Sequence, residues 1–142
     1  LIDEKDNHEY FIHKYNASNQ TKENLEKFNK NLINLKNDKD FFDKNLIRNV
    51  YLNGKNHLIA LNLINFSINS KVRVNDFSKI LKNILKIKVP IFPIDGETLK
   101  QKGMQEGQTL GNVLKTLEKD WINNNFKISN ERVEEIIKAN SN

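Results

Sequence analysis

Three glycines, Gly103, Gly107 and Gly111, recur at steps of four residues, and Thr109 lies between the last two. Glycine lets another backbone or a phosphate come close, because no Cβ stands in the way. The amphipathic pattern from Leu110 onward predicts a helix whose first N–H groups have no partner inside it, and such N–H groups attract anions. This segment therefore has the chemistry of phosphate binding without catalysis.

Lysines flank this glycine-bearing turn. Lys100 and Lys102 precede it, and Lys115 lies in the helix expected after it. A purely structural interpretation is also open, in which Gly103 ends a helix and Gly111 allows two helices to pack closely. The sequence does not distinguish the phosphate-binding interpretation from the structural one, because one glycine can permit both helix packing and the approach of a phosphate.

Two prolines set the start of the segment. Pro90 and Pro93 lack an N–H and keep the residue before them out of the helical region, so a helix arriving from upstream must end before them. Asp95 is then a good N-cap for a short helix that runs to about Lys102. Gly103 is the natural C-terminal stop of that helix.

An ordered set of residues runs through the same segment. It consists of Phe92, Pro93, Ile94, Asp95, Gly96, Leu99, Gly103, Gly107, Gly111, Leu114, Leu117, Glu118, Trp121, Ile122 and Phe126. The set resembles the C-terminal signature of the CCA-adding tRNA nucleotidyltransferases and their poly(A) polymerase relatives, and it covers Pro90 to about Val133. A weaker match lies upstream, at Arg48, Val50, Tyr51, Gly54, Ala60 and Leu61. The family usually has an acidic residue at the position of Thr98. If that residue caps or orients the turn in relatives, Asp95 and Glu97 would have to replace it in this chain.

The resemblance implies two parts: residues 1–89 as the C-terminal part of a helical body, and residues 90–142 as a tail with an RNA-binding helical hairpin and a final helix. Such a module binds tRNA and positions its 3′ end for nucleotide addition by a head domain outside this sequence, in the same or a separate chain. Magnesium and CTP or ATP would belong to that head. The residues expected to bind RNA are Lys82, Lys86, Lys88, Lys100, Lys102, Gly103, Gly107, Thr109, Gly111 and Lys115.

Catalytic residues are not expected in this chain. Asp38 and Asp40 have the spacing of a metal-binding carboxylate pair, but they lie in a polar link between two expected helices. In the family that this chain resembles, the catalytic pair follows a Gly-Ser turn on a strand. The histidines are too scattered for a zinc site, and the family's nucleotide-selecting Glu-Asp-x-x-Arg motif is absent. We therefore expect binding rather than chemistry from these residues.

Composition indicates a helical protein with a preference for anionic partners. The chain has 142 residues, of which 37% are hydrophobic and 29% charged, and a formal net charge of +5. The mean hydropathy is -0.67 and the pI about 9.3. Cysteine is absent, which excludes disulfides and thiolate metal sites and favours a cytoplasmic location. Solubility alone would explain the charge equally well.

Apolar residues at three- and four-residue steps predict an all-α bundle of about six to seven short helices. The expected helices cover residues 17–34, 41–52, 55–68, 77–85, 96–102, 110–121 and 129–137, whereas residues 1–16 have no clear period. We expect Ser18 or Thr21, Asn75 and Ser129 to cap their helices. The segment 55–68 is apolar nearly all round, which is typical of a buried central helix.

Two further functions remain open. A helical protein-interaction domain without RNA binding would use its apolar faces, and its charge would only keep it in solution. The poly(A) polymerase branch of the same family is the other alternative, because the residues that separate the branches would lie in the head. Lys82, Lys86 and Lys88 share a basic face with Lys79 that leads directly to Pro90, which favours the RNA-binding interpretation.

Overall fold

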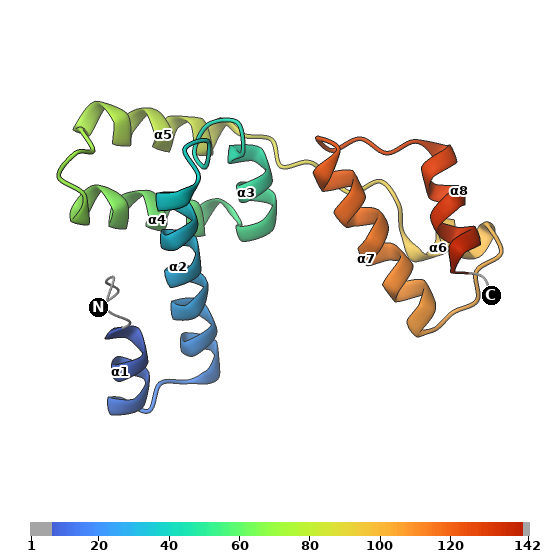
Figure 1. Ribbon diagram of the computed structural model, residues 1–142, viewed down its shortest axis with the longest axis horizontal. Coiled ribbons are helices and arrows are strands. Elements are labelled where there is room, and N and C mark those ends of the chain that lie inside the picture. The colour runs from blue at the N-terminus through green and yellow to red at the C-terminus, as the bar shows by residue number, and fades with distance from the viewer. Residues whose placement is uncertain (1–6, 141–142) are drawn as a thin grey trace. The chain divides into compact units, whose positions relative to one another are not determined.

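The computed structural model describes residues 7–140, with side chains from residue 9 onward, and these residues form eight helices and no strand (Figure 1). The helices are α1 (Asn7–Lys14), α2 (Asn19–Asn37), α3 (Leu46–Asn53), α4 (Lys55–Ile68), α5 (Val74–Lys86), α6 (Gly96–Gln101), α7 (Gln108–Asn123) and α8 (Asn130–Ala139). The predicted all-α class is confirmed, with slightly more helices than the six to seven expected.

The additional helix is α1. It contacts α2, and its hydrophobic residues form no continuous stripe. Tyr10 and Tyr15 remain largely exposed, whereas Phe11 and Ile12 are partly buried. A helix with so short an apolar edge lacks the periodicity from which the other helices were predicted.

The chain divides into two compact units, Leu1–Val89 and Pro90–Asn142, and each has its own hydrophobic core. The core of the first unit consists of Leu32, Phe41, Leu46, Val50, Leu58, Leu61 and Ile84. The core of the second consists of Leu99, Met104, Leu110, Val113, Leu117, Val133, Ile136 and Ile137. The functional terms body and tail remain predictions for these two units.

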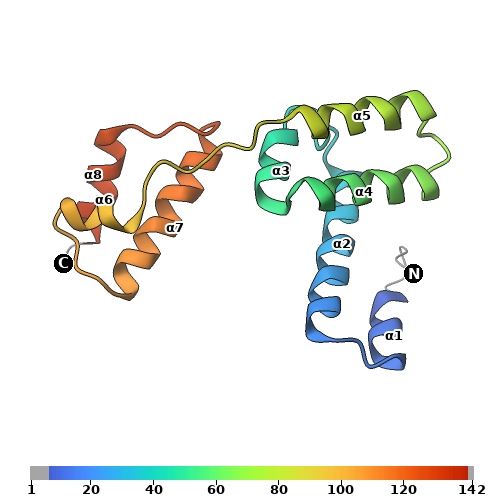
Figure 2. The ribbon, with the colours of Figure 1, turned by 180° about the vertical axis from the view of Figure 1, so that it is seen from behind.

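In the first unit, α4 and α5 lie side by side, and α2 and α3 both contact α4 (Figures 1 and 2). Ser18 caps α2 as predicted, because its hydroxyl accepts a hydrogen bond from the Thr21 N–H at 3.2 Å. Gly54 has a φ of +82° and separates α3 from α4. This left-handed backbone explains why a glycine stands between two helices that follow one another almost without a break.

The expected start of α3 was wrong. Residues 41–45 form consecutive turns, and the helix begins only at Leu46. The Asp38 carboxylate accepts the Asp40 N–H at 2.9 Å and the Asn45 amide at 2.8 Å, which holds this segment as a compact turn. Local side-chain bonds of this kind compete with helix formation.

Two expectations for α4 and α5 also need correction. Leu63 and Ile68 are 52% and 53% exposed, so α4 is buried on one side rather than all round. Asn75 does not cap α5, which already begins at Val74 after Arg73. Arg73 Nε instead donates to Asp76 Oδ2 at 3.0 Å across the first turn, where the helix dipole favours the carboxylate.

In the second unit, α6, α7 and α8 pack around a common core, with α7 contacting both of the others. Trp121 is 3% exposed and lies between the rings of Phe92 and Phe126, at centroid distances of 5.3 and 4.9 Å. Trp121 is therefore a core residue of this unit. Ser129 caps α8 by accepting the Arg132 N–H at 3.2 Å, also as predicted.

A buried polar contact links α2, α3 and α4 in the first unit. The Asn31 amide nitrogen lies 3.0 Å from Asn53 Oδ1 and 2.9 Å from His57 Nε2. The His57 ring also stacks on Phe28. Burial, and secondarily the charge of Lys27, lowers the pKa of His57 from its ordinary value of 6.5. The neutral ring is therefore the form that accepts the Asn31 amide.

We expect the first unit to lose stability as the pH falls below the unfolded-state pKa of His57. The unfolded chain then binds a proton that the folded ring resists, so acid favours unfolding. Amide hydrogen exchange of α4 between about pH 7.5 and about pH 5.5 measures this loss. His57→Gln removes the titrating ring and should flatten the pH dependence. Equal losses in both proteins would contradict the assignment.

Candidate nucleic-acid interface

The turn between α6 and α7 contains Lys102, Gly103 and Gly107 of the predicted binding residues, and the two glycines shape it. The N-cap of α6 is Asp95, whose carboxylate accepts the Thr98 N–H at 2.8 Å and the Thr98 hydroxyl at 2.7 Å. These bonds lower the pKa of Asp95. Gly103 and Gly107 have φ values of +92° and +148°, a backbone region that side chains rarely adopt. Asp95 thus caps α6, and Gly103 and Gly107 allow the chain to reverse direction between α6 and α7.

A pocket of about 440 Å³ opens at this turn. Its lining consists of Gly103, Met104, Gln105, Glu106, Gly107, Thr109 and, from the end of α8, Asn140. The first backbone bond of α7 runs from the Gly111 N–H to the Gly107 carbonyl at 3.3 Å, and no described side chain caps the helix. The earlier N–H groups therefore have no partner within α7 and can receive an anion.

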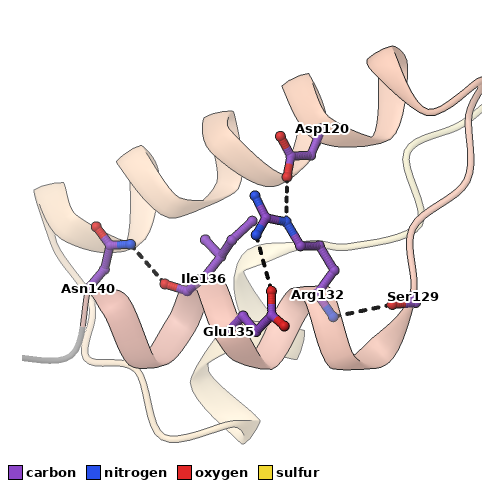
Figure 3. Close-up of polar contacts among 6 residues, drawn as sticks. All are labelled: Asp120, Ser129, Arg132, Glu135, Ile136 and Asn140. Carbon is purple, nitrogen blue, oxygen red and sulfur yellow. Dashed lines mark hydrogen bonds and ion pairs between the residues drawn. The ribbon is translucent and has the colours of Figure 1, made fainter.

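Side-chain hydrogen bonds hold α8, which is followed by the pocket residue Asn140 (Figure 3). Arg132 Nε donates to Asp120 Oδ2 at 2.7 Å, which ties α8 to α7, and Arg132 Nη1 donates to Glu135 at 3.1 Å. At the other end of α8, the Asn140 amide donates to the Ile136 carbonyl at 2.8 Å. Asn140 is therefore held by its own helix where it meets the glycine turn.

Gly111 lies in the first turn of α7 and faces open space. A Cβ added there would meet no described heavy atom within 4 Å outside its own helix backbone and chain neighbours. Close helix packing therefore does not explain Gly111, and that part of the structural interpretation was wrong. A helix containing glycine instead of alanine is weaker by about 1 kcal/mol, and no contact in the fold offsets this.

The two lysines before the turn are paired with acids. Lys100 Nζ lies 3.0 Å from Glu97 and 3.3 Å from Glu106, and these carboxylates raise the pKa of Lys100 above its ordinary value. Lys102 lies 3.7 Å from Glu134 on α8. A phosphate at this turn must compete with these carboxylates.

The positive charge of the chain lies in the first unit. Residues 1–89 contain sixteen Lys and Arg against ten Asp and Glu, whereas residues 90–142 contain seven against eight. The whole-chain value of +5 hides this asymmetry. An RNA contact at the glycine turn would therefore depend on backbone N–H groups and local geometry more than on net charge.

The remaining predicted residues are exposed lysines on both units. Lys82 and Lys86 lie on α5 and Lys88 follows it, all in the first unit, whereas Lys115 lies on α7. Lys86 also lines a pocket of about 280 Å³ with Asp43. Within the described part of the chain, none of these four lysines forms an ion pair, so their ammonium groups are available to phosphates.

Glu106 and Asn140 were missed by the sequence analysis, although both line the pocket. Glu106 lies between Gly103 and Gly107, so the sequence could have indicated that its negative charge opposes that of Lys100. Nothing in the sequence pairs Asn140 with a turn more than thirty residues earlier, because this proximity follows from the packing of α8.

Comparison of the chain with protein-family models, curated proteins and solved structures gave no match. Across residues 7–140, no group of three His, Asp or Glu side chains could hold a metal ion. His8 was one of the histidines considered for such a site, and its side chain lies outside the described residues. No helix within residues 7–140 is long and apolar enough to cross a membrane.

Glycine substitutions should separate the two roles of glycine in this segment. Gly111→Ala should stabilise the second unit by about 0.5–1 kcal/mol, because it improves helix propensity without a clash. Gly107→Ala should destabilise it by more than about 1 kcal/mol, because alanine is strained at this φ. Urea unfolding followed by Trp121 fluorescence measures both, since Trp121 is the only tryptophan and is buried in this unit. A destabilised Gly111→Ala variant would contradict the open surroundings of Gly111.

Proposed function

We propose that this chain is the C-terminal tRNA-binding portion of a CCA-adding tRNA nucleotidyltransferase. It holds tRNA so that the RNA 3′ end reaches a head domain that performs nucleotide transfer with magnesium and CTP or ATP. The parent protein is a transferase that acts in the cytoplasm, and these residues contribute binding. Holding the substrate in place lowers the entropic barrier to reaction without supplying a chemical group.

The observation that carries this proposal is Gly111, which has open space around it and lies beside uncapped N–H groups. A phosphate or ribose can approach the α7 backbone here more closely than any side chain would allow. Gly103, Gly107 and Thr109 line the adjoining pocket. Recognition of this kind depends on RNA shape and backbone contacts, which suits a folded RNA better than a base sequence.

The lysines of α5 and its C-terminal extension supply the long-range attraction in this proposal. Lys82, Lys86 and Lys88 are exposed and unpaired among the described residues. Phosphate contacts of this kind release counterions, so affinity must fall steeply as salt rises. The acids around Lys100 and Lys102 weaken the attraction of the tail for RNA phosphates. Binding at the tail would therefore require a close geometric fit between the RNA and the glycine turn.

The first experiment measures binding of the full chain to tRNA and to a single-stranded RNA of equal length over a salt series. We expect a preference for tRNA and an affinity that falls with salt, because folded RNA presents its phosphates in a fixed arrangement. Equal affinity for the two RNAs, or binding unchanged by salt, would contradict the proposed role in tRNA binding.

A set of variants locates the contact. Lys100→Gln with Lys102→Gln should weaken tRNA binding and lower the salt slope by about 1 for each phosphate that no longer meets a lysine. Glu106→Gln should strengthen binding, because it releases Lys100 from a competing carboxylate. Gly111→Ala should weaken tRNA binding while leaving the chain folded. Lys127→Gln, which removes one positive charge beyond the far end of α7, is the control and should change little.

A helical protein-interaction domain is the second candidate. Leu63, Ile68 and Val74 are each more than half exposed near the connection between α4 and α5, and such residues could contact an apolar partner. This binding would be nearly indifferent to salt and lost in Leu63→Ser, whereas tRNA binding should survive that change. The poly(A) polymerase branch of the family differs in the head, and nucleotide incorporation by the head-containing protein distinguishes it.

A further inference from the structure

A second pocket, of about 580 Å³, opens between α2 and α3 in the first unit. Three cations line it: Lys27 and Lys30 from α2, and Arg48 from α3. Its volume is in the range of small-molecule sites. None of the residues expected to bind RNA lies in this lining, so the pocket is separate from the glycine turn.

The cations of this pocket are free to bind an anion. Arg48 could have paired with Glu26 or Asp43 by sequence position, but within residues 9–140 neither it nor Lys27 nor Lys30 forms an ion pair. Asp38 is the acid in the lining, and both of its carboxylate oxygens already accept hydrogen bonds, from Asp40 and Asn45. The lining thus has three available positive charges against one carboxylate that is engaged in a turn.

Asparagine side chains make up much of the remaining wall, and the amide nitrogens of Asn45 and Asn49 are used within the fold. The Asn49 amide donates to the Phe41 carbonyl at 2.8 Å, and the Asn45 amide donates to Asp38. These bonds fix both side chains, while their Oδ1 atoms accept no hydrogen bond from any described residue. Asn45 and Asn49 therefore present acceptors beside the cations.

This combination fits a nucleotide better than a simple anion. A phosphate satisfies Lys27, Lys30 and Arg48 through charge-assisted hydrogen bonds. Inorganic phosphate has little use for amide oxygens, whereas ribose hydroxyls and exocyclic amino groups are donors that match them. A wall with cations and amide oxygens therefore matches a ligand that has both a phosphate and hydrogen-bond donors.

We propose that the pocket between α2 and α3 binds one phosphate-bearing nucleotide, with its phosphate on Lys27, Lys30 and Arg48 and its sugar or base donors on Asn45 and Asn49. The nucleotide is either free or one unit of an RNA strand. The proposal does not depend on tRNA binding at the glycine turn, because the two sites share no residue.

The test is an NMR titration of the labelled full chain with AMP, with inorganic phosphate and with a short single-stranded RNA. AMP should shift the side-chain amide signals of Asn45 and Asn49, and inorganic phosphate should bind about tenfold or more weakly. If the short RNA produces these shifts and AMP does not, the nucleotide is part of a strand. Inorganic phosphate binding as tightly as AMP would reduce the pocket to an anion site and overturn the proposal, as would the absence of shifts with all three probes.

Charge variants show whether the binding is specific. Arg48→Gln with Lys30→Gln should weaken AMP or RNA binding about tenfold or more, and Arg48→Lys should restore part of it. Lys71→Gln, between α4 and α5, removes one exposed charge outside the pocket and should leave the affinity within about twofold. An equal loss in Lys71→Gln would mean general charge attraction and overturn the site. Gly111→Ala should leave AMP binding unchanged, which separates this result from the tRNA experiment.

Discussion

The second unit depends on burying Met104 in the short turn between α6 and α7. Met104 joins the core of Leu99 and Leu110, and its N–H bonds to the Leu99 carbonyl at 3.1 Å. The chain must reverse on both sides of it, and Gly103 and Gly107 provide the left-handed backbone for this. The pocket, the exposed start of α7 and the contact with Asn140 all follow from that reversal.

Charge and geometry are divided between the two units, and this shapes any account of RNA binding. The first unit has the excess of Lys and Arg, whereas the second pairs Lys100 and Lys102 with its own acids. Charge attraction acts over about a Debye length and carries little geometric information, while backbone N–H groups at a helix start act only on contact. A binder built this way would gain affinity from one unit and selectivity from the other.

The features predicted well from the sequence are those decided locally. Asp95 and Ser129 cap their helices, and Gly103 ends α6, because each acts through residues within four positions along the chain. The late start of α3 depends on a side-chain bond that competes with helix formation, whereas at the early start of α5 a side-chain bond spans the first turn of the helix. Long-range contacts were out of reach, since the pairing of Lys102 with Glu134 and the position of Asn140 exist only once α8 has packed.

Asparagine illustrates the limit of composition as a guide. The chain is rich in asparagine, and its composition alone assigns this residue no role. In the first unit, however, asparagine amides hold the turn before α3 and join α2 to α3 and α4. An amide carries both a donor and an acceptor, so a side chain that uses its nitrogen to hold the fold still offers its oxygen to a ligand. The asparagines that hold the first unit together are thus the same residues that would allow its pocket to bind a ligand.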